Sequence, residues 1–205
     1  MALSETAICN MSLSLFGDMR ISSIDDATET ANLCKLWYEQ CRDEVLSESG
    51  VEWRFAIART QLTQCATNPD FGWNYQYQLP ADLLKIIKVL DVYSATVYPY
   101  ADLPQEYDIN WKREGDKILT NWTTCYLHYV KQETDVTKFP ALLVKSIYTL
   151  LASVLAGRIA SNAQKSLELL QEYEAILSKA KSTNAEECYV EDEEGYNSWV
   201  NTGRY

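Results

Sequence analysis

The single histidine, His128, is the first residue to consider for acid–base chemistry. It lies in the segment CYLHYV, an apolar and aromatic run that is typical of a β-strand. General-base catalysis needs a partner that positions the imidazole, and no serine or cysteine motif beside His128 supplies one. The sequence therefore predicts that His128 faces solvent or a subunit contact and has no catalytic role.

The chain has six cysteines, and no two of them have the spacing of metal ligands or of a C-x-x-C pair. Cys34 and Cys41 are seven residues apart, which places both on one face of a helix, where a free thiol packs as a small apolar group. We expect all six to be reduced and structural. The cysteines are Cys9, Cys34, Cys41, Cys65, Cys125 and Cys188.

Paired carboxylates and phosphate loops are the remaining candidates for chemistry. Asp25 and Asp26 favour the positive end of a helix dipole, and neighbouring helix residues such as these point in different directions. The seven glycines are dispersed, and neither H-E-x-x-H nor G-x-S-x-G occurs. We therefore expect no catalytic residues, no metal or cofactor site, and no enzymatic activity.

Composition limits the partners. The 205 residues, 47% of them apolar, fit one domain or one domain with a modest insertion, and the formal charge of −11 repels nucleic-acid phosphates. Trp73, Tyr75 and Tyr77 are flanked by amides rather than cations, which favours core and subunit packing over base stacking. The longest apolar stretch, residues 140–156, contains Lys145 and is shorter than a bilayer span, so we expect a buried helix and no membrane contact. The N-terminus lacks the pattern of a secretory signal, which predicts cytosolic synthesis.

Helical periodicity marks both ends of the chain. A short helix is expected over residues 5–16, closed by Gly17. A long helix is expected to begin after Ser23, as its N-cap, and to end near Gly50. After Pro140 a second periodic region predicts a helix and, over residues 162–181, an antiparallel partner. The inward residues predicted for that partner are Ala163, Leu167, Leu170 and Leu177.

Between these helices the apolar period changes from near 3.6 to 2. Strands are predicted over residues 75–79, 86–93, 106–112, 117–121 and 124–131, with Gly115 in a hairpin turn and Pro80 ending the first ladder. Residues 53–58 read as a short helical or turn element. The predicted class is α+β: a mainly α-helical bundle with a small inserted β-rich domain and an extended C-terminal tail. The predicted divisions are residues 1–71, 72–135, 136–182 and 183–205.

The order of these elements resembles the tail tubular protein A family, the head-to-tail adaptors of short-tailed bacteriophages. The resemblance spans residue 13 to about residue 180 and rests on several short pieces. These are a first helix ending at Gly17, I-S-S-I-D-D at 21–26, C-R-D-E-V-L at 41–46, W-R-F-A-I-A-R at 53–59, Y-Q-L-P-A-D-L-L-K-I-I-K-V at 77–89, and the late helical pair.

The resemblance implies a virion protein at the head–tail junction, made in the host bacterial cytoplasm. It implies a ring of twelve copies below the portal protein, with a tail nozzle or tail tube protein beneath and DNA passing through the channel without specific binding. It also implies that the acidic, aromatic C-terminal segment packs on the portal. The candidate anchors are Tyr189, Tyr196, Trp199 and Val200.

Two other classes of function remain open from the residues alone. One is a non-catalytic interaction module that binds a single partner through its C-terminal tail. The other is a muralytic enzyme, against which the lack of a recognisable triad, metal site or isolated acidic pair argues.

Overall fold

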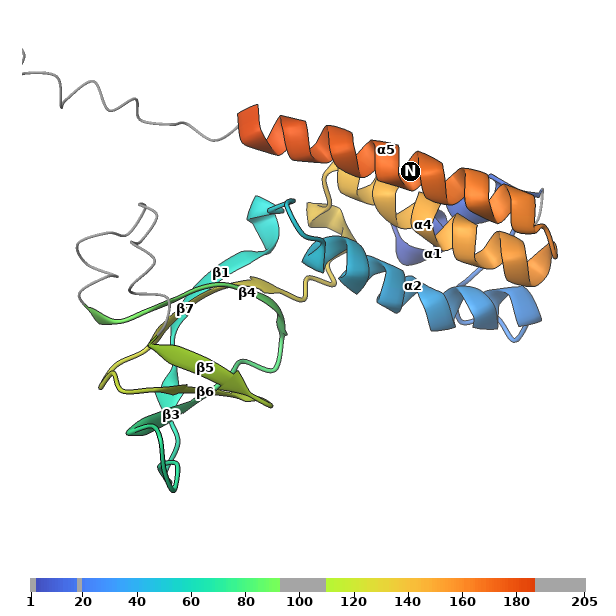
Figure 1. Ribbon diagram of the computed structural model, residues 1–205. Helices are drawn as coiled ribbons and strands as arrows, with labels where there is room; N and C mark the ends of the chain where they lie inside the picture. The colour runs from blue at the N-terminus through green and yellow to red at the C-terminus, as the bar shows by residue number, and fades with distance from the viewer. Residues whose placement is uncertain (1–2, 18–19, 93–109, 187–205) are drawn as a thin grey trace, which may run out of the picture.

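The computed structural model describes residues 3–17, 20–92 and 110–186, and its fold is α+β, as predicted (Figure 1). The helices gather at one end of the molecule and the strands at the other, where they form two antiparallel sheets. Within the described residues the α-helices are α1 (Glu5–Leu13), α2 (Glu29–Ser47), α4 (Ala141–Ile159) and α5 (Ala163–Glu186).

Helix α4 is the central helix, because it packs against α1, α2 and α5. Leu143, Ile147 and Leu151 are completely buried. By length and composition alone α4 could cross a bilayer, yet 61% of its most apolar window is buried inside the protein. That burial is typical of the core helix of a folded domain.

The start of α2 differs from the prediction. Thr28 is the N-cap, with its hydroxyl accepting from the amide of Ala31 at 3.2 Å. The predicted cap, Ser23, lies instead in a turn where the Asp26 carboxylate accepts from two preceding backbone amides, each at 2.9 Å. A carboxylate that binds nearby amides in this way competes with helix formation. The helix therefore begins at Glu29.

The two sheets are named here by their strand order. Sheet A has the order β1-β7-β4 and sheet B the order β2-β3-β6-β5, and every pairing is antiparallel. Sheet A consists of β1 (Ile57–Gln61), β7 (Tyr126–Lys131) and β4 (Leu83–Leu90). Sheet B consists of β2 (Thr63–Gln64), β3 (Tyr75–Gln78), β6 (Lys117–Thr120) and β5 (Trp111–Glu114).

Most predicted strands are present, and the structure contains two further strands that were not predicted. Strands β3, β6 and β7 lie within their predicted ranges, and β4 begins three residues before its range. Of the strand predicted over residues 106–112, residues 106–109 lie outside the described residues, and the observed strand β5 begins at Trp111. The missed strands, β1 and β2, precede residue 72, so by strand pairing the β-rich part begins at Ile57. The short element before it is a 3-10 helix (Arg54–Ala56). Gly115 has φ +60° in the β5–β6 hairpin, as predicted.

Two main apolar clusters hold the fold together. The first lies among the helices and extends to sheet A through Val130, with Leu84 and Ile87 packed against it. The second lies between the sheets and includes Tyr77, Ile118 and Leu127. The β-rich part thus has a core of its own, and it also shares the core of the helices.

The predicted inward face of α5 is largely wrong. Leu167 is 57% exposed and Leu170 41% exposed, whereas Leu177 is buried as expected. Ala163 is also exposed. The face that packs on the protein is made of Leu169, Tyr173, Ile176, Leu177 and Ala180.

Candidate functional site

His128 lies at the centre of sheet A, opposite Arg59 of β1 and Lys88 of β4. Burial lowers the pKa of His128, and the positive charges of Arg59 and Lys88 lower it further against the opposing effect of Glu52. The imidazole is therefore neutral at neutral pH. Its Nε2 atom is buried without a hydrogen-bond partner.

The described cysteines are free thiols, and four of them, Cys9, Cys34, Cys41 and Cys125, are buried. Burial raises the pKa of Cys41 and of Cys125 to about 12, which disfavours the reactive thiolate. Cys65 is half-buried, and Cys188 lies outside the described residues.

The adjacent carboxylates Asp25 and Asp26 have separate structural roles. Asp25 forms an exposed ion pair with Lys35 at 2.6 Å, and Asp26 closes the turn before α2. Among residues 3–17, 20–92 and 110–186, no group of three or more His, Cys, Asp or Glu side chains could hold a metal ion.

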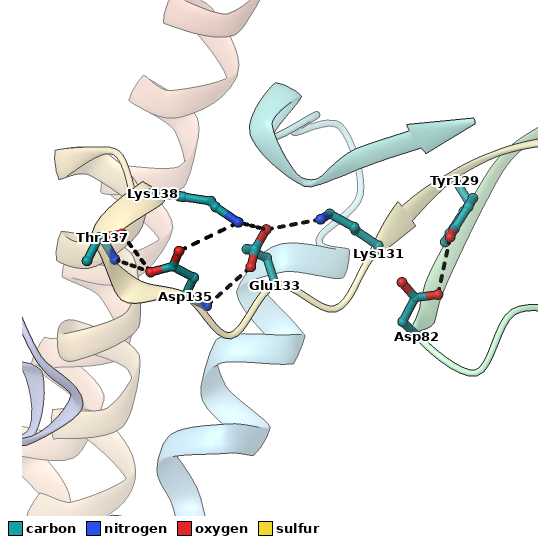
Figure 2. A network of polar contacts seen from close by, with 7 residues as sticks. All are labelled: Asp82, Tyr129, Lys131, Glu133, Asp135, Thr137 and Lys138. Carbon is teal, nitrogen blue, oxygen red and sulfur yellow. Dashed lines mark hydrogen bonds and ion pairs between the residues drawn. The ribbon is translucent and has the colours of Figure 1, made fainter. Parts of the chain in front are cut away.

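A network of polar contacts lies where the chain passes from β7 to α4 (Figure 2). Its centre is Glu133, whose side chain is 8% exposed and accepts from Lys131 and Lys138, each at 3.1 Å. The same carboxylate accepts from the amide of Asp135 at 3.2 Å. Asp135 in turn accepts from the amide and hydroxyl of Thr137, and so caps the following 3-10 helix (Val136–Lys138).

Electrostatics favour the charged form of Glu133. Burial alone would raise the pKa of Glu133, but the hydrogen bonds from Lys138, Lys131 and the Asp135 amide outweigh it, and the pKa is lowered. The Lys138 pKa is raised, chiefly by its hydrogen bond to Glu133. Both shifts favour the charged forms of Glu133 and Lys138.

A second set of contacts joins the sheets to the helices beside Glu133. The Gln132 amide group donates to Asp43 of α2 at 2.6 Å, and Asp43 also pairs with the buried Arg42 at 2.8 Å. The backbone amide of Gln132 donates to the carbonyl of Asp82 at 2.7 Å, and the Asp82 carboxylate accepts from the Tyr129 hydroxyl at 3.2 Å.

A further lysine, Lys85 of β4, donates to the carbonyl of Glu48 just beyond α2 at 3.2 Å. We call all these residues the junction: Arg42, Asp43, Glu48, Asp82, Lys85, Tyr129, Lys131, Gln132, Glu133, Asp135, Thr137 and Lys138. Together with the shared apolar core, its hydrogen bonds from Gln132 to Asp43 and from Lys85 to Glu48 connect the sheet A side of the protein to α2. Each of these side chains takes part in a hydrogen bond or an ion pair, so the role we infer for the junction is structural.

Apolar side chains are exposed at both ends of the molecule. Phe71, in the loop that leads into β3, is 87% exposed. On the helices, Leu36 of α2 is 57% exposed, and Leu167 and Leu170 lie on the outer face of α5. Such residues are candidates for contacts with other proteins.

The predicted portal anchors, Tyr189, Tyr196, Trp199 and Val200, lie outside the described residues. The sequence reading also missed Phe71 and Glu133. Phe71 sits in N-P-D-F-G, a turn signal in which a large apolar residue is unusual. Glu133, between two lysines in K-Q-E-T-D-V-T-K, had no comparable signal, because its burial depends on the packing of β7 and α4.

No protein-family model matches the chain, and no curated protein sequence matches it.

Proposed function

We propose that the protein is a structural virion protein, a head-to-tail adaptor that forms a ring, joins the portal to the tail and encloses part of the DNA ejection channel. The proposal starts from the resemblance of the chain to the tail tubular protein A family. The structural observation that carries it is the junction, which connects two parts of different architecture. An adaptor has to hold two binding surfaces at a set separation and orientation, and the hydrogen bonds and shared apolar core between sheet A and the helices would serve that requirement.

The exposed apolar residues support the same proposal. Leu36, Leu167 and Leu170 lie on the helices and Phe71 on the β-rich part, so each part has apolar surface available for a partner. In a ring, neighbouring copies would contact one of these two apolar surfaces, and a tail protein would contact the other. The formal charge of −11 suits a channel wall, because an acidic surface makes few tight contacts with DNA phosphates.

In this proposal the finer architecture is a helical bundle carrying an inserted β domain, with a C-terminal segment that docks on the portal. Tyr189, Tyr196, Trp199 and Val200 are its proposed anchors. The protein would reach the head–tail junction after synthesis in the host cytoplasm, and would work without a cofactor or catalytic residues.

The test is negative-stain electron microscopy of the protein mixed with the portal protein from the same genome, beside each component alone. We expect portal rings that gain a second tier. A protein truncated after residue 186 should keep its helical circular dichroism spectrum and lose portal binding.

Three outcomes would each contradict a different part of the proposal. If the full chain adds no density to the portal, the adaptor function is wrong. Binding of one soluble partner through the tail, without rings, would favour the interaction module instead. If the truncated protein binds portal as the full chain does, only the tail anchors are wrong.

A further inference from the structure

The loop between β2 and β3, residues 65–74, presents one large apolar side chain to solvent. We call it the tip loop. Phe71 at its turn is 87% exposed, more than any other large apolar residue among those the structure describes. In Figure 1 the segment before β3 lies at the end of the molecule farthest from the helices. Phe71 thus contributes little to the core.

The tip loop is held in shape by its own hydrogen bonds. Gln76 of β3, 8% exposed, donates from its side chain to the carbonyl of Thr67 at 2.6 Å and to the Thr67 hydroxyl at 3.1 Å. The Cys65 amide donates to the Gln76 carbonyl at 2.9 Å, and the Asn74 amide donates to the Asn121 side chain at 3.0 Å. The base of the loop is therefore fixed on both sides.

Gly72 completes the turn beside Phe71. It has φ +84°, a conformation that L side chains rarely adopt, and a Cβ there would meet no atom within 4 Å. Glycine is therefore favoured here by the positive φ angle, since an added Cβ would meet no steric clash. The turn that follows Phe71 is thus built into the loop.

A fixed loop with an exposed ring has the properties of a binding anchor. Phenylalanine buries a large apolar area on association, and it loses little conformational entropy when the loop that carries it is already ordered. Anchors of this kind fill pockets at the centre of an interface, where one side chain contributes much of the affinity.

The charge around the tip loop restricts the partner. Asp70, which is exposed, is the one charged side chain in residues 65–74. Sheet B itself has charges of both signs, because strands β5 and β6 and the turn between them carry Lys112, Arg113 and Lys117 together with Glu114 and Asp116. Beside Phe71 the charge is therefore that of Asp70, which favours a pocket rimmed by Lys or Arg over a phosphate surface.

We propose that the tip loop is the tail-side docking element of this protein, with Phe71 inserted into an apolar pocket of a tail protein and Asp70 facing a basic rim. The inference rests on the proposed adaptor function and adds to it the surface, the anchor and the chemistry of the partner. The portal and the neighbouring copies of the ring would use other surfaces.

The experiment measures binding of the full chain to two immobilised probes, the purified portal protein and the purified tail nozzle or tube protein of the same genome. The variants are Phe71→Ala, Phe71→Leu, Asp70→Lys and, as a control at the opposite end, Leu36→Ala. Because Phe71 and Asp70 are exposed, all four proteins should have the thermal stability of the wild type to within a few degrees.

We expect Phe71→Ala to weaken tail-protein binding about 30-fold or more, and Phe71→Leu to weaken it by less than about 10-fold. Asp70→Lys should weaken it most at low salt, since the rim interaction is electrostatic. Portal binding should be unchanged in these three variants, and Leu36→Ala should bind the tail protein as the wild type does.

Other results would overturn the inference. If Phe71→Ala binds the tail protein with wild-type affinity while portal binding persists, the tip loop is not the docking element and the adaptor function stands. If the wild type binds neither probe, the adaptor function fails and the inference fails with it. Binding to phosphatidylcholine vesicles that depends on Phe71, without binding to the tail protein, would identify a membrane contact instead.

Discussion

Replacing Glu133 by glutamine tests the central ion cluster of the junction. The substitution keeps the size of the side chain and an acceptor for the Asp135 amide, but it removes the charge shared by Lys131 and Lys138. A shielded hydrogen bond to a charged group contributes about 1.5–3 kcal/mol. These two lysine side chains are 32% and 51% exposed, however, and recover hydration when released, which reduces the contribution of each contact. The expected loss of unfolding free energy is about 1–2 kcal/mol.

The assay is urea unfolding monitored by circular dichroism, together with thermal unfolding, where the same loss lowers Tm by about 2–8 °C for a chain of this size. The matched control is Glu114→Gln, which removes an exposed ion pair with Lys112. That change should alter stability by less than about 0.5 kcal/mol. An equal effect of both substitutions would mean that the Glu133 cluster is no more than a surface ion pair.

Acid provides a second check on the same residue. The pKa of Glu133 is lowered in the folded protein, so its contribution is fully present above the unfolded value near 4.5 and is lost as pH falls through the folded pKa. The stability difference between wild type and Glu133→Gln should therefore shrink as the solution is acidified below 4.5. A difference that stays constant or grows on acidification would refute the assignment of the cluster.

Three further predictions concern the core, the turns and the thiols. Leu151→Ala removes a completely buried side chain of α4 and should lower stability by about 2–5 kcal/mol in urea unfolding. Gly115→Ala should destabilise by about 1 kcal/mol because φ is +60° there. Gly157→Ala is the matched control, because Gly157 lies within helix α4 and an added Cβ would have its nearest neighbour at 3.9 Å. This substitution should leave stability unchanged or raise it by up to about 1 kcal/mol. If both substitutions destabilised the protein, the argument from the positive φ of Gly115 would be wrong. In native protein treated with a maleimide and mapped by mass spectrometry, Cys65 should be modified faster than the four buried thiols, and equal rates would show that those thiols are accessible.

The sequence predicted the fold well where one local pattern decides the structure. Alternation of apolar residues identified β3, and the glycine of the β5–β6 turn was found from its neighbours alone. The packing of Cys34 and Cys41 on one buried face of α2 was also predicted, from their seven-residue spacing. Each of these features depends on residues within a few positions of one another.

The errors come from contacts between distant residues. Strand β1 has no apolar alternation that marks it, and it exists because β7, about seventy residues later, pairs with it. On α5 two apolar faces compete. Leu167 and Leu170 have the right spacing for a core, but α4 covers the face of Leu169 and Tyr173 instead. Glu133 is buried for the same kind of reason, through the packing of separate elements.

The pairing of β1 with β7 brings the two ends of the β-rich part together. The polypeptide leaves the helices at Ala56 and returns at Gln132, and the strands at these two points are neighbours, with Ile57 opposite Val130. Paired residues in an antiparallel ladder lie only about 5 Å apart. A short linker could therefore span the distance between the two points at which the β-rich part joins the helices. The β-rich part has the topology of an insertion whose two ends lie side by side.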